Sequence, residues 1–336
     1  MNKSFILSTG SYLPRKMLSN NEIASIVETS DEWIRQRTGI VQRHIADEGE
    51  LTSDLAVNAA KSAIEKAKIS VDEIDLIIVA TTTPDKTFPS CATIVQSKLK
   101  CKNAFAFDVQ AACSGFIYAV TVADSLIKSN NRIKYALVIG AEIMSRIVDW
   151  ENRSTCVLFG DGAGAVIMKS ACHFNVIPTN DADTWVAEKG VTKGIISTSL
   201  YSDGNVDILC TNGGISSTGD SGKICMNGRE VFKHAVDKLT ASVEETLKCN
   251  NLKITDIDWL IPHQANIRII EAVVKKLDFP IEKVINTVDK HANTSAASIP
   301  LALDYAIQES KIKSGNLVLL ISIGAGLTWG SVLLHY

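Results

Sequence analysis

The sequence has little net charge and no long apolar run. Its 336 residues carry 34 lysines and arginines against 37 aspartates and glutamates, a formal net charge of −3. A nucleic-acid-binding domain is usually strongly basic, so no nucleic-acid partner is expected. No apolar run reaches the length needed to span a bilayer, and the apolar stretch near the N-terminus is too short for a secretory signal peptide. The sequence therefore predicts a cytoplasmic protein with no membrane partner.

The motifs of common metal and nucleotide sites are also missing. None of the eight cysteines belongs to a C-x-x-C pair, which argues against a zinc ribbon or a thioredoxin-like site. The glycine-rich stretches FGDGAGAV (159–166) and IGAGLTWGS (323–331) do not have the G-x-G-x-x-G spacing of a dinucleotide-binding loop. We therefore expect neither a metal nor a bound cofactor. Close approach of backbone near a site is the better use of these glycines.

What the chain does contain is an internal repeat. The segment AIEKAKISVDEIDLIIVATTTPD and the later segment TLKCNNLKITDIDWLIPHQAN each run from the end of a helix, through an Ile-Asp pair, into an apolar strand. Asp75 then matches Asp258 at a displacement of 183 residues. The segments that follow repeat as well, and matching Leu137 with Leu319 gives 182, which sets Cys113 opposite Ser295. The alternative is coincidence, because every α/β protein repeats helix–strand units.

The repeat predicts an α/β protein with two similar halves, 1–171 and 194–336, joined by a linker at 172–193. Its apolar strands, such as LIIVA and LVLLIS, have the uninterrupted character of buried sheet strands. In open α/β sheets the chemistry gathers beyond the carboxyl ends of the strands. We therefore expect loops from both halves to meet in one cleft.

Cys113 lies where a strand gives way to a helix, in the small-residue run AACSG. The N-terminus of a helix favours negative charge and lowers the pKa of a thiol placed there. Its small neighbours leave room for a substrate. These features favour a nucleophile, and a buried structural cysteine is the alternative.

Two polar residues of the second half could complete a site. His263 follows the apolar strand WLI and a proline, and no metal-binding pattern surrounds it. Asn293 precedes a helix-start signature, and its amide could donate to a developing oxyanion. The alternatives are a structural or surface histidine and an asparagine that only caps a helix.

Five stretches, in this order, resemble motifs of the β-ketoacyl-[acyl-carrier-protein] synthase III family of the thiolase superfamily: TSDEWIRQRTGI (29–40), FGDGAGA (159–165), PHQANIR (262–268), HANTSAAS (291–298) and GLTWGS (326–331). The resemblance covers nearly the whole chain and implies a thiolase-like duplicated αβαβα layered fold and a homodimer. It implies condensation of a short acyl-CoA, expected to be acetyl-CoA, with malonyl-[acyl-carrier-protein]. The products would be 3-oxoacyl-[acyl-carrier-protein], CO₂ and CoA. Two departures are a longer linker at 172–193 and Ala325 where a third glycine is common.

The resemblance also implies roles for individual residues. Cys113, His263 and Asn293 would form the catalytic triad, with Cys113 carrying the acyl group. The loop Gly324, Ala325 and Gly326 would bind an oxyanion, and Phe88 would reach across the dimer to the partner's acyl pocket. The residues expected to bind CoA are Thr29, Trp33, Arg37, Arg153, Phe232 and Asn266.

A basic face marks the segment ANIRIIEAVVKKLD, where Arg268, Lys275 and Lys276 lie close to one side of a helix. Carrier proteins are acidic, so this face is a candidate docking site, and charge complementarity would raise the association rate. The alternative is an ordinary solvated helix face. The expected docking residues are Lys233, Gln264, Ala265, Asn266, Ile267, Arg268, Lys275 and Lys276.

Several related activities fit the sequence less well. A degradative thiolase would need a second cysteine in the C-terminal glycine loop, which reads IGAGLTWGS, and an elongating ketosynthase would need a second histidine where Asn293 stands. Plant-type polyketide synthases lack the TSDEW and FGDGAG stretches, and the C-G-S-C-W signature of papain-like proteases is absent here. A non-catalytic acyl-binding or carrier-docking relative is the alternative from another class, and the presence of all three triad residues argues against it.

Overall fold

Two β-sheets of the same strand order form the frame of this computed structural model, which describes residues 3–171 and 193–336. The first sheet runs β1 (Ser4–Tyr12), β7 (Asp161–Ser170), β6 (Tyr135–Ile143), β4 (Leu76–Ala80) and β5 (Phe105–Val109). The second runs β8 (Gly194–Ser202), β13 (Thr328–His335), β12 (Leu317–Gly324) and β11 (Trp259–Pro262). In each sheet the first two pairings are antiparallel and the third is parallel. The repeat read from the sequence is thus a repeat of topology.

Helices lie between and outside these sheets. The main helices are α3 (Thr52–Ala67), α4 (Cys91–Leu99), α5 (Gly115–Ser129), α7 (Gly228–Cys249), α8 (Ile267–Lys276) and α10 (Ser298–Gln308). The shorter elements are β2 (Lys16–Ser19), α1 (Asn20–Ala24), α2 (Asp31–Thr38), β3 (Gln42–Ile45), α6 (Arg153–Cys156), β9 (Leu209–Thr211), β10 (Ile224–Met226) and α9 (Val288–His291). The 3₁₀ turns are η1 (Val71–Glu73), η2 (Ala112–Ser114), η3 (Met144–Arg146), η5 (Ile254–Asp256), η6 (Ile281–Lys283) and η7 (Ser295–Ala297). None of the described helices is long and apolar enough to cross a membrane.

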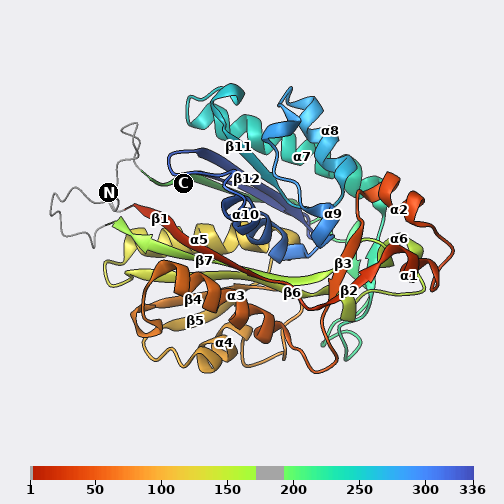
Figure 1. The fold of residues 1–336 in the computed structure, drawn as a ribbon, viewed down its shortest axis with the longest axis horizontal. Coiled ribbons are helices and arrows are strands. Elements are labelled where there is room, and N and C mark those ends of the chain that lie inside the picture. The colour runs from red at the N-terminus through yellow and green to blue at the C-terminus, as the bar shows by residue number, and fades with distance from the viewer. Residues whose placement is uncertain (1–2, 172–192) are drawn as a thin grey trace.

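The elements stack in layers (Figure 1). Helices α3 and α4 cover the outer face of the first sheet, α5 and α10 lie between the two sheets, and α7 and α8 cover the outer face of the second. The expected αβαβα layering is therefore confirmed. Apart from Lys193, the predicted linker at 172–193 lies outside the described residues, and the boundaries of the two halves stay a prediction.

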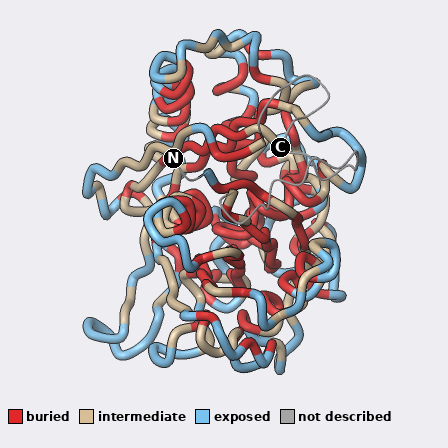
Figure 2. Tube along the Cα trace, turned by 90° about the vertical axis from the view of Figure 1, so that its left-hand side faces the viewer, coloured by how far each residue is buried: buried red, intermediate tan, exposed pale blue. Residues whose placement is uncertain are grey.

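The central strands are buried on both faces because each face packs on helices. In β4, Leu76 and Ile78 face the middle layer, whereas Ile77 and Val79 face α3 and α4. This explains why the strand reads as an unbroken apolar run. The buried residues fill the centre of the molecule and the exposed ones lie at its rim (Figure 2).

The two halves also share an unusual backbone turn. Turns η2 and η7 each precede a middle-layer helix, and each begins with a residue other than glycine at positive φ, Ala112 at 46° and Ser295 at 49°. This conformation is costly for a side chain other than glycine, so its recurrence identifies equivalent positions. Ala112 therefore corresponds to Ser295, and Cys113 corresponds to Ala296. The expected match of Cys113 with Ser295 was wrong by one residue. The displacement between equivalent residues is still 183 at the turn and falls to 182 only between the helix and the following strand.

Candidate active site

Cys113 lies in turn η2, between β5 and helix α5, with 7% of its surface exposed. Ser114, which follows it, is the N-cap of α5. The thiol is therefore at the start of a helix, as predicted. The C-terminal half holds the turn in place: the Ser322 hydroxyl donates to the Cys113 carbonyl at 2.8 Å, and Thr328 donates to the Ala111 carbonyl at 3.0 Å.

The expected low pKa of the Cys113 thiol is wrong, because its pKa is raised. Burial raises the pKa of Cys113 to about 12, although a hydrogen bond from Ser295 lowers it, and the nearby charge of Glu142 raises it further. The cause is desolvation, since a thiolate in a nearly closed site loses its water while a thiol loses little. Helix-start position alone does not ionise this nucleophile.

The end of β12 approaches the nucleophile so closely that only glycine fits there. A Cβ built on Gly324 would lie 2.7 Å from the backbone nitrogen of Cys113 and 2.9 Å from the Ala111 carbonyl oxygen. Ala325 and Gly326 continue the loop and line the hollow beside Cys113. The predicted oxyanion loop and the nucleophile are therefore direct neighbours.

His263 comes directly after β11 and is 4% exposed. Its backbone N–H donates to Ile321 at 2.8 Å, and its Nδ1 lies 2.5 Å from the Ser298 hydroxyl. The Gln264 N–H donates to the same hydroxyl oxygen at 3.3 Å, which favours donation of the Ser298 proton to Nδ1. Burial lowers the His263 pKa to about 3. The ring is therefore neutral near pH 7, with its proton assigned to Nε2.

Asn293 lies between α9 and η7 and is 6% exposed. It caps no helix, because Thr294 is the N-cap of η7 and Ala297 that of α10. Its Oδ1 accepts a hydrogen bond from the Ser295 N–H at 2.9 Å, and its backbone pairs with Phe159 of the other half. With Oδ1 engaged, the amide nitrogen is the atom left to face a ligand.

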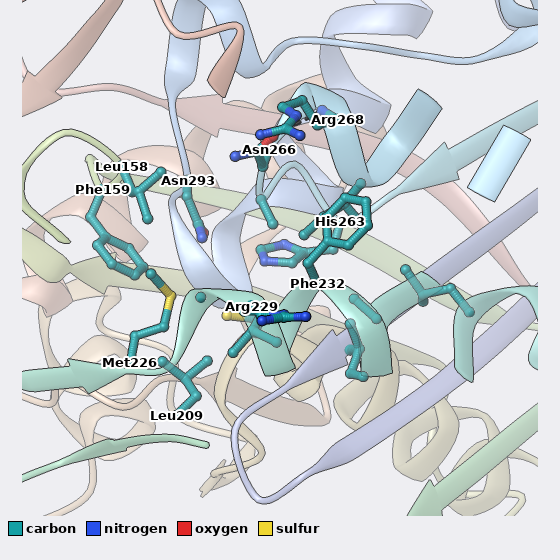
Figure 3. Close-up of a pocket in the computed structure, with 18 residues that line it drawn as sticks. Leu158, Phe159, Leu209, Met226, Arg229, Phe232, His263, Asn266, Arg268 and Asn293 are labelled. Carbon is teal, nitrogen blue, oxygen red and sulfur yellow. Dashed lines mark hydrogen bonds between the residues drawn. The ribbon is translucent and has the colours of Figure 1, made fainter. Parts of the chain in front are cut away.

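Cys113 lies where two hollows meet. The first, of about 420 Å³, is lined by Cys113, His263 and Asn293 together with residues of α7 and α8. In Figure 3, the apolar side chains of Phe159 and Met226 lie on one side of this pocket, Phe232 and His263 lie on the other, and Asn293 lies between. The second hollow, of about 930 Å³, extends from Cys113 past loop residues 82–87 and the hairpin of β9 and β10. A buried thiol, a neutral imidazole and an amide nitrogen thus line one cavity.

Comparisons with known proteins agree with this geometry. Models of the 3-oxoacyl-[acyl-carrier-protein (ACP)] synthase III family match residues 107–180, and models of its C-terminal part match residues 247–336. The β-ketoacyl-[acyl-carrier-protein] synthase III of Wolbachia pipientis wMel is 93% identical, and that of Ehrlichia canis is 58% identical, each over 100% of both chains. The crystal structure of 3-oxoacyl-[acyl-carrier-protein] synthase III from Aquifex aeolicus is 48% identical, with a TM-score of 0.88 over 99% of this chain and 100% of that one.

This chain belongs to the β-ketoacyl-[acyl-carrier-protein] synthase III family. It is accordingly an acyltransferase with the thiolase-like fold, the initiating condensing enzyme of type II fatty acid synthesis. The resemblance seen in the sequence is confirmed. The roles of single residues are a separate matter and depend on their placement.

Of the residues that the synthase III resemblance assigns to CoA, Phe232 and Asn266 line the first pocket, and Trp33 and Arg37 lie on α2, which contacts α8. Arg153 stacks on Trp33 with its guanidinium carbon 5.0 Å from the ring centroid, and Arg37 lies 5.9 Å away. Because this spacing is too small to hold another ring, an adenine bound between Arg153 and Trp33 would require Arg153 to move. The buried Thr29 hydroxyl nearby has no hydrogen-bond partner among the described residues. Asn266 joins the two sides of the mouth by donating to the Arg37 carbonyl at 3.1 Å.

The predicted basic face of α8 is exposed, but one of its cations is paired with a carboxylate. Arg268 lies 6.0 Å from the Phe232 ring at the pocket mouth, and Lys233 and Lys275 face solvent. Lys276, however, forms an ion pair with Asp237 of α7 at 2.8 Å. The face therefore carries less free charge than its sequence suggests.

Gln264 corrects the expected docking set. Its side chain is completely buried, donates to the carbonyls of Pro262 and Ile285, and accepts from the Thr287 N–H at 2.7 Å. It fixes the loop that carries His263 and cannot touch a carrier protein. The side chains of Ala265, Asn266 and Ile267, which follow, are partly exposed.

Sequence reasoning missed three groups at the site. Arg229, in the first turn of α7, lines the pocket beside Phe232, and Ser298 holds the His263 ring. Glu142 lies buried at the end of β6 and reaches the site through Ser295. Only Glu142 carried a clear signal, because a carboxylate at the carboxyl end of a buried strand is a candidate site residue.

Proposed function

We propose that this enzyme joins a short acyl-CoA, with acetyl-CoA as the expected primer, to malonyl-[acyl-carrier-protein] through an acyl-Cys113 intermediate. The observation that carries the proposal is the meeting of Cys113, His263 and Asn293 in one pocket. The products are 3-oxoacyl-[acyl-carrier-protein], CO₂ and CoA.

In the first half-reaction the Cys113 sulfur attacks the thioester carbon and CoA leaves as its thiol. The oxyanion of the tetrahedral intermediate accepts hydrogen bonds from backbone N–H groups of Cys113 and of the Ala325 loop. Support comes from Gly324, which lets this loop lie against the Cys113 nitrogen. Preorganised backbone donors of this kind stabilise developing charge without reorganising.

In the second half-reaction the malonyl group loses CO₂ and leaves an enolate, whose carbon attacks the acyl group and frees the Cys113 sulfur. The enolate oxygen needs two donors, and we assign them to Nε2–H of His263 and Nδ2–H of Asn293. The contact of Nδ1 with the Ser298 hydroxyl supports this role, because a neutral ring that accepts at Nδ1 carries its one proton on Nε2. The engaged Oδ1 of Asn293 likewise leaves the correct end of its amide free.

The substrates would approach from the α7 and α8 side. The pantetheine arm would occupy the 420 Å³ pocket past Phe232 and Asn266, with the adenine at Trp33 and Arg153. An acidic carrier protein would dock on the exposed face formed by Lys233, Ala265, Asn266, Ile267, Arg268 and Lys275, with Lys276 contributing less because of its ion pair.

We further propose that the enzyme works as a cytoplasmic homodimer. The Phe88 side chain is 82% exposed on the single chain, an unfavourable position for a large apolar group unless a partner covers it. Insertion of Phe88 into the partner's 930 Å³ hollow would close the acyl end of that site. The number of carbons accepted would then depend on both subunits.

The test is intact-protein mass after brief incubation with acetyl-, propionyl- and branched short-chain acyl-CoAs. A gain of one acyl group, absent in Cys113→Ser, supports the acyl-enzyme, and the favoured mass identifies the primer. Addition of malonyl-[acyl-carrier-protein] should then discharge the acyl group as 3-oxoacyl product. No adduct and no product on folded protein would overturn the proposal in favour of a non-catalytic acyl-binding protein.

A further inference from the structure

Glu142, at the end of β6, is a completely buried carboxylate that the reaction above does not use. No lysine or arginine in the described part of the chain forms an ion pair with it. Its oxygens instead accept from the hydroxyls of Thr81, Thr82 and Thr83, from the Thr82 N–H, and from the Ser295 hydroxyl. Buried charges are usually paired, so such a site invites a functional explanation.

Ser295 connects this carboxylate to the nucleophile. Its hydroxyl donates to Oε1 of Glu142 at 3.2 Å, which leaves the lone pairs of its oxygen open to the Cys113 thiol, and Ser295 and Cys113 line the same hollow. Turns η2 and η7 pack against each other, so the two equivalent turns of the repeat bring these groups together. The three groups form a chain of sulfur, hydroxyl and carboxylate.

The nucleophile needs a proton acceptor, since burial opposes its ionisation. The His263 imidazole is a poor base because burial lowers its pKa to about 3, and its Nδ1 is already engaged by Ser298. Burial raises the pKa of Glu142, which makes its carboxylate a stronger base than an exposed one. Besides Cys113, the titratable group Cys91 lies near Glu142, and burial raises its pKa; Asp85 and Asp108 lie on the side of Cys91.

We propose that the thiol proton of Cys113 passes through the Ser295 hydroxyl to Glu142 as the sulfur attacks the acyl-CoA, a step that rests on the proposed function. The S–H proton moves to Ser295 Oγ, and the proton already on Oγ moves to Oε1 of Glu142. The sulfur lone pair forms the new C–S bond while the carbonyl becomes an oxyanion. When that intermediate collapses, the bond to CoA sulfur breaks, and the proton held by Glu142 returns through Ser295 to yield CoA as its thiol. In this relay Ser295 exchanges the proton with the sulfur directly, and Glu142 is a positioning residue that acts through Ser295.

The test is the single-turnover rate of Cys113 acylation by acetyl-CoA, followed by intact mass from pH 6 to pH 9. Glu142→Gln should acylate at least about 100-fold more slowly at pH 7, the usual range for loss of a general base. Its rate should then rise about tenfold per pH unit, because only thiolate formed by hydroxide reacts. If Glu142 acts merely as a nearby negative charge, its removal lowers the thiol pKa and acylation becomes faster, which would overturn the proposal.

Further variants separate a relay from a structural role. Ser295→Ala should match Glu142→Gln, Ser295→Thr should recover the rate because it restores a hydroxyl, and the double variant should be no slower than either single one. Asp161→Asn is the matched control: this buried carboxylate accepts from the Ser145 hydroxyl at 2.6 Å, and burial raises its pKa too. Its pH profile should keep the shape of the parent enzyme. The relay would be overturned if the losses in acylation rate of the two single variants added in the double variant, or if Asp161→Asn changed the pH profile as much as Glu142→Gln does.

If Glu142→Gln does not fold, the comparison of Ser295→Ala with Ser295→Thr tests the relay by itself. Decarboxylation of malonyl-[acyl-carrier-protein] needs no thiol proton and reports whether the cleft of each variant is intact. Failure of the parent enzyme to acquire an acyl group would instead contradict the proposed function. The two failures are therefore distinguishable.

Discussion

The two halves of this synthase share a frame and differ in what the frame carries. Four strands of each half have the same order and the same relative directions. In each half a 3₁₀ turn with a strained first residue precedes a middle-layer helix. In the first half the second residue of that turn is Cys113, and in the second half it is Ala296. The repeat thus has two equivalent positions in turns that pack against each other, and only the first of them holds a cysteine, the proposed nucleophile.

The halves also differ at the edge of the sheet. The first sheet has β5 as its fifth strand, whereas in the second the corresponding pairing is a single parallel bridge between Leu260 and Val284. The chain then continues through α9 and delivers Asn293 to the site. Without a fifth strand to complete, this segment is free to cross over and pair with Phe159 of the other half.

The largest effect should come from removing the proposed nucleophile. Cys113→Ala should abolish acylation completely, because the equivalent position in the second half holds only Ala296. Intact mass after incubation with acetyl-CoA measures this. Malonyl decarboxylation should remain, since its donors belong to the other half. An acyl adduct on the variant would mean that another residue can be acylated. The nucleophile would then not distinguish the first half from the second.

Removing either proposed hydrogen-bond donor of the second half, His263 or Asn293, should have the opposite result: acylation is kept and condensation is lost. His263→Ala and Asn293→Ala should each slow condensation by about 100- to 1000-fold, or about 3–4 kcal/mol, while Cys113 still becomes acylated. Separate assays of acyl transfer and of 3-oxoacyl product distinguish the two half-reactions. A variant that loses acylation but keeps decarboxylation would show that the roles are assigned to the wrong half.

The contact between the halves can be tested at Gly324. Gly324→Ala puts a methyl group 2.7 Å from the Cys113 nitrogen, so the nucleophile turn must shift. We expect a loss of about 1–3 kcal/mol in the free energy of unfolding, together with slower acylation. Gly49→Ala is the control, because a Cβ there meets nothing within 4 Å. Equal effects of the two substitutions on urea denaturation and on acylation would contradict the close approach.

The smallest effect concerns the pH dependence of stability, which has opposite signs for two buried histidines of the second half and two buried carboxyls of the first. In the second half, burial lowers the pKa of His263 to about 3 and of His291 to about 4. Below pH 6.5 the unfolded chain therefore binds more protons, and each histidine reduces stability by up to about 1.4 kcal/mol per pH unit as the pH falls.

In the first half, burial raises the pKa of Glu142 and Asp161. The stability linked to these carboxyls is present below their unfolded pKa and is lost as the pH rises through their folded pKa. His291→Gln should therefore lessen the fall in stability between pH 7 and pH 5, as measured by urea denaturation at both. An unchanged difference would mean that His291 titrates normally.

The alternation of helices with apolar strands made the repeat and the two-half α/β organisation accessible from the sequence, whereas the layered fold and the proposed triad were implied by the resemblance to the synthase III family. The residue-level details were less accessible. The match of Cys113 with Ser295 failed because residues within a loop have no periodicity that sets their register. Gln264 looks like a surface residue in the sequence, yet three backbone groups bind it in the interior.

The sequence by itself determined the elements, the duplication, and the residue types available at the ends of the strands, because these depend on local periodicity and composition. The tertiary structure alone decided which of them meet and how they are charged. Cys113 and Ser295 become neighbours only when the two turns pack, and the pKa values of Cys113 and His263 depart from their ordinary values in opposite directions because the surrounding layers exclude water. Desolvation is a property of packing between segments far apart in the chain, so no local pattern could specify it.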